Sequence, residues 1–235
     1  NKMFVSDRQR RTEMEGNMKK DTTIVISCAG MGTRLGIGCT KALVEIIDKP
    51  LILHQLELLN DYDDICIVVG YQAEQVIDVV TKFRKDIRFA FNYDYKTTGT
   101  AASLSKALLG SRKYIVTLDG DLLVHPDDLK KVINFDGECI CGCVPTTDNP
   151  VLMETQINNN LETVIEFSRE HGNYEWTGLA KIETNRLVSG NQHVYQMLEP
   201  LLPLPLKVIR SQEIDTINDY EKAINWIKNN YINEE

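Results

Sequence analysis

Residues 22–41 read TTIVISCAGMGTRLGIGCTK and join an apolar run to a glycine-rich loop. The run TTIVIS (22–27) has the length and β-branched composition of a buried strand. Glycine lets backbone N–H groups approach an anion closely, and Arg34 and Lys41 can neutralise its charge. The stretch therefore predicts a strand followed by a loop that binds a phosphate chain. The loop glycines are Gly30, Gly32, Gly36 and Gly38.

The loop matches neither of two common phosphate-binding motifs. Leu35 stands where the third glycine of G-x-G-x-x-G would be, and G-x-x-x-x-G-K-[ST] cannot be written over this stretch. Charged loop residues are usually just solvated, so a tight loop with two solvated cations is the alternative interpretation.

Strand patterns alternate with helix patterns through the first part of the chain. Four β-then-α units predict a parallel sheet with helices on both faces, and ligands of such sheets bind at the carboxyl ends of the strands. The expected strands are 22–27, 64–70, 87–92 and 113–121, and the expected helices are 50–60, 72–83, 100–109 and 126–135.

The second part of the chain changes character, because strand patterns follow one another with turn residues between them. We therefore expect an α/β protein of Rossmann-like three-layer α/β/α architecture, with a mostly parallel mixed sheet and an antiparallel extension. The expected strands are 137–145, 151–157, 162–168, 174–182 and 206–211, and the expected helices are 191–199 and 216–230.

Composition excludes several classes of protein. The 235 residues are 43% hydrophobic and carry a net charge of −8 without a basic tract, which argues against a nucleic-acid surface. No apolar run has the roughly 18 residues of a membrane span, and the N-terminus lacks the apolar core of a signal peptide. We expect no membrane partner and a cytoplasmic location. Cys139, Cys141 and Cys143 alternate as one face of a strand, which is not zinc-site spacing.

Acidic residues follow two of the expected strands. Asp119 and Asp121 in LDGDLL would repel one another unless a cation neutralised them, and Mg²⁺ is the economical choice. An ordinary turn with helix-capping acids is the alternative. Asp215 in EID offers a further acid, although it also fits the N-cap of the last helix.

The glycine loop and the residues that follow it resemble a known family. AGMGTRLGIGCTKALVEIIDKPLI (29–52) is similar to the signature of nucleotidyltransferases that activate phosphate-bearing small molecules, the MobA-like and sugar-phosphate nucleotidyltransferase superfamily. The resemblance implies the nucleotide-diphospho-sugar transferase fold. It continues through VVGYQAEQV (68–76), TTGTAASL (97–104), LDGDLLV (118–124) and EIDTINDYEKA (213–223).

The resemblance implies a division of the chain. Residues 22–235 would form one nucleotidyltransferase domain, with a nucleotide-binding half at 22–135 and an acceptor-binding half at 136–235. Residues 1–21 would be a linker or tail, with an upstream fused domain among the alternatives, and a homodimer is a further expectation.

The resemblance also implies roles for single residues. Arg34 would hold the triphosphate, Lys41 would bridge nucleotide and acceptor phosphate, and Asp121 and Asp215 would hold Mg²⁺; these four are the expected catalytic residues. Thr40 stands where the family has a proline, and the segment between the two cations is short. The expected nucleotide-binding residues are Ala29, Gly30, Met31, Gly32, Thr33, Arg34, Gly70, Tyr71, Thr98, Gly99, Thr100 and Asp119.

The expected reaction joins a nucleoside triphosphate, CTP by preference, to a small acceptor and releases pyrophosphate. The ending EIDTINDYEKAINWI resembles cytidylyltransferases for phosphocholine and aminoalkylphosphonates, whose cationic head group aromatic side chains can bind. A sugar-1-phosphate acceptor with CTP, UTP, dTTP or GTP is the close alternative. The expected acceptor residues are Tyr93, Arg169, Glu175 and Trp176.

Two alternatives come from other classes of protein. A glycosyltransferase also combines a nucleotide domain with D-x-D acids, and a regulatory module can keep the fold without the chemistry. His171 and His193 are not expected to be catalytic, because no nucleophile pairs with either in the sequence.

Overall fold

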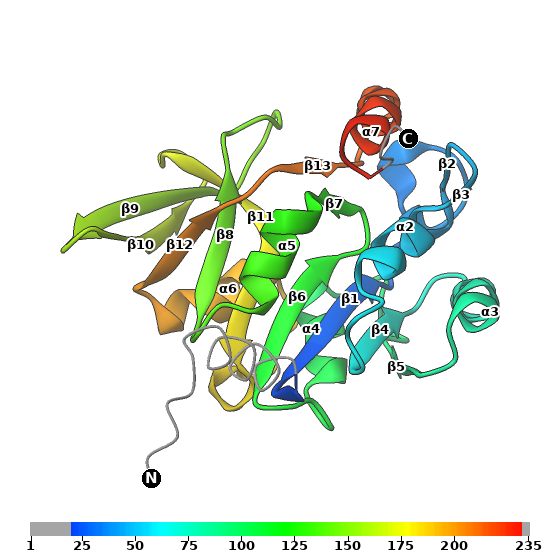
Figure 1. The fold of residues 1–235 in the computed structure, drawn as a ribbon, viewed down its shortest axis with the longest axis horizontal. Helices are drawn as coiled ribbons and strands as arrows, with labels where there is room; N and C mark the ends of the chain where they lie inside the picture. The colour runs from blue at the N-terminus through cyan, green and yellow to red at the C-terminus, as the bar shows by residue number, and fades with distance from the viewer. Residues whose placement is uncertain (1–19, 232–235) are drawn as a thin grey trace, which may run out of the picture.

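A computed structural model describes residues 20–231, which form one continuous nine-stranded sheet between two layers of helices (Figure 1). The strand order is β5-β4-β1-β6-β11-β8-β12-β10-β9. Residues 1–19 lie outside the described range, so their role as a linker or tail stays a prediction. The sheet strands are β1 (Thr22–Cys28), β4 (Ile65–Val69), β5 (Ile87–Phe91), β6 (Tyr114–Asp119), β8 (Cys139–Cys143), β9 (Leu152–Asn158), β10 (Leu161–Ser168), β11 (Tyr174–Glu183) and β12 (Leu204–Val208).

The predicted mixed sheet is confirmed. Strands β5, β4, β1 and β6 are parallel neighbours, and β11 joins them antiparallel to β6. The pairs β11–β8, β12–β10 and β10–β9 are antiparallel, while β8 and β12 are parallel. The carboxyl ends of β1 and β6 are therefore neighbours at one edge of the sheet, because parallel strands point the same way.

Helices cover both faces, as the α/β pattern predicts. Along β1, Ile24 and Ile26 face the core shared with α2, α3 and α5, while Val25 faces the core shared with α4 and α6. This alternation follows from the two-residue period of a strand. The helices are α2 (Leu51–Leu58), α3 (Ala73–Phe83), α4 (Thr100–Ala107), α5 (Pro126–Ile133), α6 (Val194–Leu198) and α7 (Ile217–Asn230).

A small third core joins the C-terminal helix to the glycine loop. Leu35 from the loop packs with Leu123, Ile214 and Ile227. Figure 1 shows α7 beside the short strands that surround this core. These strands are β2 (Glu45–Ile46), β3 (Lys49–Pro50), β7 (Leu122–Val124) and β13 (Ser211–Glu213).

The strand predicted at 206–211 is wrong in its bounds. The chain pairs with β8 and β10 over Leu204–Val208, then leaves the sheet and pairs with β7 over Ser211–Glu213. This break carries the following acids from the main sheet toward the end of β6. The helix expected at 191–199 is also shorter, at Val194–Leu198.

Candidate active site

The glycine loop leaves β1 and enters a short 3₁₀ turn at Thr33–Leu35. Gly32 and Gly36 flank this turn with φ of 62° and 71°, a left-handed conformation that side chains with a Cβ rarely adopt. A Cβ on Gly32 would also lie 3.1 Å from the Lys41 side chain. Because Leu35 is buried in the third core, the loop is anchored between its two cations.

The two cations of the loop meet carboxylates from distant parts of the chain. Lys41 Nζ lies 2.6 Å from Oδ2 of Asp121 and 2.5 Å from Oδ1 of Asp215. Arg34 Nη1 lies 2.5 Å from the other carboxylate oxygen of Asp215, although the Arg34 side chain is 75% exposed. Burial opposes the charge of Lys41, but the two carboxylates outweigh it and raise the pKa of the ammonium.

The N-cap of α7 is Thr216 and not Asp215, for which the sequence allowed this role as an alternative. Thr216 Oγ1 accepts from the Asp219 N–H, and the Asp219 carboxylate accepts from the Thr216 N–H at 3.0 Å, which is a capping box at the start of α7. The Asp215 carboxylate turns instead toward Lys41.

A third acid, Glu213, joins the cluster and was not among the predicted site residues. Among residues 20–231, Asp121, Glu213 and Asp215 each offer a carboxylate oxygen within 4.8 Å of the others. Burial, then the charge of Asp121, raises the pKa of Glu213 to about 7. The sequence held a signal for it, because Glu213 and Asp215 are two residues apart.

The donor set of this cluster fits a magnesium ion. Mg²⁺ prefers hard oxygen ligands and is usually held by one or two carboxylates together with substrate phosphates. Asp121 and Asp215 supply such oxygens beside Glu213. The ammonium of Lys41 neutralises only part of the negative charge of these carboxylates. The predicted ligands Asp121 and Asp215 are therefore close enough to share one ion.

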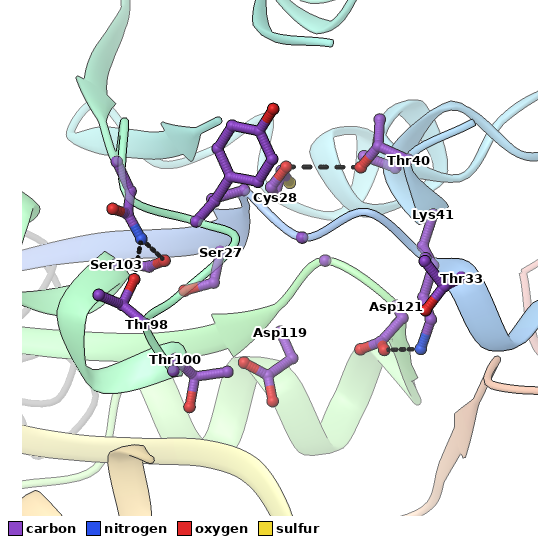
Figure 2. Close-up of a pocket in the computed structure, with 18 of the residues that line it drawn as sticks. Ser27, Cys28, Thr33, Thr40, Lys41, Thr98, Thr100, Ser103, Asp119 and Asp121 are labelled. Atoms are coloured by element: carbon purple, nitrogen blue, oxygen red, sulfur yellow. Dashed lines mark hydrogen bonds and ion pairs between the residues drawn. The ribbon is translucent and has the colours of Figure 1, made fainter. Parts of the chain in front are cut away.

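Asp119 occupies a different position from Asp121, although only Gly120 separates them. Its carboxyl group packs against Gly178 of β11, where any Cβ would clash with it. Burial, then the charges of Asp121 and Glu213, raises the pKa of Asp119 well above its usual range. In Figure 2 Asp119 lies near the middle of the pocket, whereas Asp121 lies with Lys41.

A cavity of about 410 Å³ connects the loop with helix α4. Figure 2 shows Thr33, Lys41 and Asp121 toward one end of it and Thr98 and Ser103 toward the other. Predicted site residues that line the cavity are Ala29, Gly30, Gly32, Thr33, Arg34, Lys41, Thr98, Gly99, Thr100, Asp119 and Asp121.

Three predicted nucleotide-binding residues, Met31, Gly70 and Tyr71, are not among the cavity-lining residues of the described range. Gly70 lies between the residues that follow β1 and β5, because a Cβ there would lie 2.9 Å from the carbonyl oxygens of Ala29 and Asn92. The Tyr71 N–H donates to the Ala29 carbonyl at 3.0 Å. Gly70 and Tyr71 thus contact the start of the loop, and their nucleotide contacts stay predictions.

The end of the cavity at α4 holds polar residues that sequence reasoning missed. Asn92 is buried, and its Nδ2 donates to Thr98 Oγ1 at 3.1 Å and to Ser103 Oγ at 3.0 Å. Tyr95 and His193 also line this cavity. Asn92 and Tyr95 lie in the polar stretch that follows β5, whereas only the arrangement in space identifies His193.

Within the described range none of the four predicted acceptor residues lines the cavity, and their acceptor contacts stay predictions. Tyr93 is 81% exposed and stacks on Phe91. The buried Glu175 carboxylate accepts from the N–H groups of Thr146 and Thr147. The other two also have protein partners, because Trp176 packs on Phe167 and Arg169 donates to the Asn149 carbonyl.

The glycine loop, the acid cluster and the mixed sheet together define a nucleotide-diphospho-sugar transferase fold. The chain belongs to the MobA-like NTP transferase domain family, which it matches over residues 24–183. A similar solved structure is the CTP:phosphocholine cytidylyltransferase LicC from Streptococcus pneumoniae, with a TM-score of 0.69 and 22% identity, covering 88% of this chain and 100% of that one.

Curated relatives are larger proteins. The bifunctional protein GlmU of Methanococcus maripaludis is 25% identical over 186 residues, which are 76% of this chain and 42% of GlmU. Mannose-1-phosphate guanyltransferase 2 of Candida glabrata is 34% identical over 90 residues, which are 35% of this chain and 25% of that protein. The chain thus spans less than half the length of these relatives. Within residues 20–231, no helix has the length and apolar character needed to cross a membrane.

Proposed function

We propose that this chain is a Mg²⁺-dependent nucleotidyltransferase that joins a nucleoside triphosphate to a small phosphate- or phosphonate-bearing acceptor and releases pyrophosphate. The observation that carries the proposal is the meeting of Lys41 with Asp121 and Asp215 beside a nucleotide-sized cavity. A hydrolase would need an activated water or nucleophile, whereas this site offers charge neutralisation and backbone donors.

The chemistry is displacement at the α-phosphorus of the triphosphate. An oxygen of the acceptor phosphate, already anionic at neutral pH, forms a bond to that phosphorus, and the bond to the β-phosphate oxygen breaks. No general base is needed, so the chain contributes positioning and charge. Arg34 and Lys41 stabilise the negative charge that develops on the leaving pyrophosphate.

Asp121 and Asp215, with Glu213 beside them, would hold the magnesium ion. When bound, Mg²⁺ supplies neutralisation of phosphate charge at the reacting centre. Lys41 lies against two of these carboxylates and can move between them and a bound phosphate, since its flexible stem carries a point charge.

For the substrates, we propose CTP with an acceptor of the phosphocholine or aminoalkylphosphonate type. The sequence ending at 213–227 and the likeness to the fold of LicC support this choice. Tyr93, Arg169, Glu175 and Trp176 stay the proposed acceptor residues, and binding would require that some of them exchange their present partners. A sugar-1-phosphate acceptor is the second candidate, favoured by the similarity to a mannose-1-phosphate guanyltransferase.

The test is pyrophosphate release from CTP, UTP, GTP and dTTP, each with Mg²⁺ and with phosphocholine, aminoethylphosphonate or common sugar-1-phosphates. We expect release that requires both substrates and is lost in D121A. Asp63, an exposed partner of Arg112, provides a matched control, D63A, that should retain the rate. Release of a nucleoside diphosphate from a nucleotide-sugar would favour the glycosyltransferase, and nucleotide binding without turnover of any pair would favour a regulatory module.

A further inference from the structure

A segment from the C-terminal part of the chain crosses the start of helix α4. We call residues 190–193, which precede α6, the 190–193 strap. The Gly99 N–H donates to the Asn191 carbonyl at 2.8 Å, and the Ala101 N–H donates to the Gln192 carbonyl at 3.0 Å. The first N–H groups of a helix have no partner inside the helix, so the strap carbonyls satisfy donors that α4 leaves open.

Two further hydrogen bonds join the strap and the residue after it to α4. The Val194 N–H donates to Thr100 Oγ1 at 3.1 Å, and the Gly190 N–H donates to Ser105 Oγ at 3.1 Å. A Cβ on Gly99 would clash with the Gln192 backbone, so only glycine permits this approach. The strap therefore has one position relative to α4.

That position brings His193 to the cavity wall. The His193 ring stacks on Tyr195 with centroids 5.9 Å apart and an interplanar angle of 8°. Tyr195 packs in turn on Phe167, at 5.6 Å between centroids. One face of the imidazole is thus supported by protein. The His193 side chain also accepts from the backbone N–H of Gln196, and the Gln196 side chain accepts from the His193 N–H at 3.0 Å, which is a capping box at the start of α6.

The two ends of the cavity differ in chemistry. Arg34 and Lys41 are at the end formed by the glycine loop, which suits the phosphates. The nucleoside of a bound triphosphate must then extend toward the other end. Uncharged polar side chains line that end, among them Thr98, Thr100 and Ser103 (Figure 2). Asn92 lines it too and donates to Thr98 and Ser103.

We infer that His193 is a nucleotide-binding residue that contacts the nucleoside part of the substrate, with the 190–193 strap as the device that positions it. A supported aromatic ring suits a base or ribose by stacking, and the imidazole nitrogen outside the capping box can add a hydrogen bond. The inference rests on the proposed function, since it requires a nucleotide in the cavity. It also assigns a nucleotide contact to residues 136–235, the half of the chain expected to bind the acceptor.

Titration calorimetry of the full chain with two kinds of ligand tests this inference. The ligands are inorganic tripolyphosphate and whichever of CTP, UTP, GTP and dTTP the unaltered protein binds most tightly. We expect H193A to weaken nucleotide binding about 3- to 10-fold, the size of one lost hydrogen bond or ring contact. Tripolyphosphate binding should stay within twofold. R34A should weaken both ligands, because it acts at the phosphate end.

H171A is the matched control, since His171 is exposed in the same half of the chain and does not line the cavity. H193F keeps a ring on Tyr195 and serves as a folded comparison for H193A. Because it loses the side-chain half of the capping box, its melting temperature should fall by only a few degrees. Unchanged nucleotide affinity in H193A, or an equal loss for both ligands, would overturn the inference. Failure of the unaltered protein to bind any nucleotide would instead overturn the proposed function.

Discussion

Lys41 Nζ lies 2.6 Å from Oδ2 of Asp121, although 80 residues separate the two in the sequence. Lys41 follows the glycine loop, and Asp121 follows β6, which is the parallel neighbour of β1. The parallel pairing therefore makes the contact, because it brings both carboxyl ends to one edge of the sheet. The same ammonium reaches Asp215, so one cation links three segments of the chain.

Replacing Lys41 should remove most of the activity. K41A takes away a charge that neutralises phosphate and leaves Asp121 and Asp215 to repel each other, so we expect pyrophosphate release to fall about 100-fold or more. K49A is the control, because Lys49 pairs with Glu57 outside the cavity lining. A K41A rate within threefold of the unaltered rate would remove Lys41 from the mechanism.

The pair of Asp128 and Arg210 should give stability a specific dependence on pH. The side-chain hydrogen bond from Arg210 lowers the pKa of Asp128 to about 2, against about 3.9 for a free aspartate. A carboxyl whose pKa is lower in the folded state stabilises the fold above the unfolded pKa and loses this contribution as pH falls.

We therefore expect D128N to lower the free energy of unfolding by about 1 kcal/mol at pH 6, and the difference should shrink as pH falls from about 4 toward 2. Urea unfolding at several pH values measures this. D78N, at the exposed pair with Lys82, should show a much smaller difference. A D128N difference that grows at low pH would contradict the assignment.

The buried lysine of β11 should matter for stability and not for chemistry. Lys181 is 1% exposed, and its Nζ donates to the carbonyl oxygens of Ile133 at 2.8 Å and Phe135 at 2.6 Å, at the end of α5. K181M leaves both carbonyls without that donor, so we expect it to lower the free energy of unfolding by about 2–4 kcal/mol.

In K181M the free energy of unfolding should fall while kcat, measured on folded protein, stays nearly unchanged. Denaturant unfolding and the rate of pyrophosphate release measure the two quantities. K82M, at an exposed position of α3, is the control and should change neither quantity. A large loss of kcat in folded K181M would show that the lysine acts on the site.

Gly99, which contacts the strap, and Gly190, which opens it, should respond differently to an added methyl group. G99A places a Cβ against the Gln192 backbone, so we expect a loss of about 1–3 kcal/mol in stability and weaker nucleotide binding. G190A places its Cβ 3.5 Å or more from its neighbours and should be tolerated. Melting curves and calorimetry measure both effects. Equal behaviour of the two variants would mean that strap and helix do not pack as described.

Local patterns in the sequence were sufficient to predict most of the architecture. The β-then-α alternation from residue 22 to 135 predicted the parallel strands, because each unit has a clear period and turn residues at its ends. The prediction of one strand at 206–211 was wrong in its bounds, because the apolar pattern continues where the chain changes its pairing partner from the main sheet to β7. Which strand a segment pairs with is a long-range property that a local pattern does not contain.

The site was predictable only where it coincided with motifs. Arg34, Lys41 and Asp121 lie in motifs that the resemblance covers, and the structure brings Lys41 and Asp121 together. Glu213 was missed although it lies in the motif at 213–223, whereas His193 was missed because only the arrangement in space brings it to the cavity. The four acceptor residues were predicted from their chemistry and their place near the expected acceptor side. Each contacts other protein groups, and their role stays a prediction.

Phosphorus-31 NMR of the reaction mixture is the sharpest test of nucleotidyl transfer, because it shows which phosphorus–oxygen bond breaks. The sample contains the protein, Mg²⁺, the nucleoside triphosphate and the acceptor that give the fastest turnover. We predict equal growth of free pyrophosphate and of a new phosphoanhydride or phosphonate anhydride signal that joins acceptor and α-phosphate, with neither signal in D121A. Free nucleoside diphosphate with inorganic phosphate, or no new signal with any pair of substrates, would contradict the account.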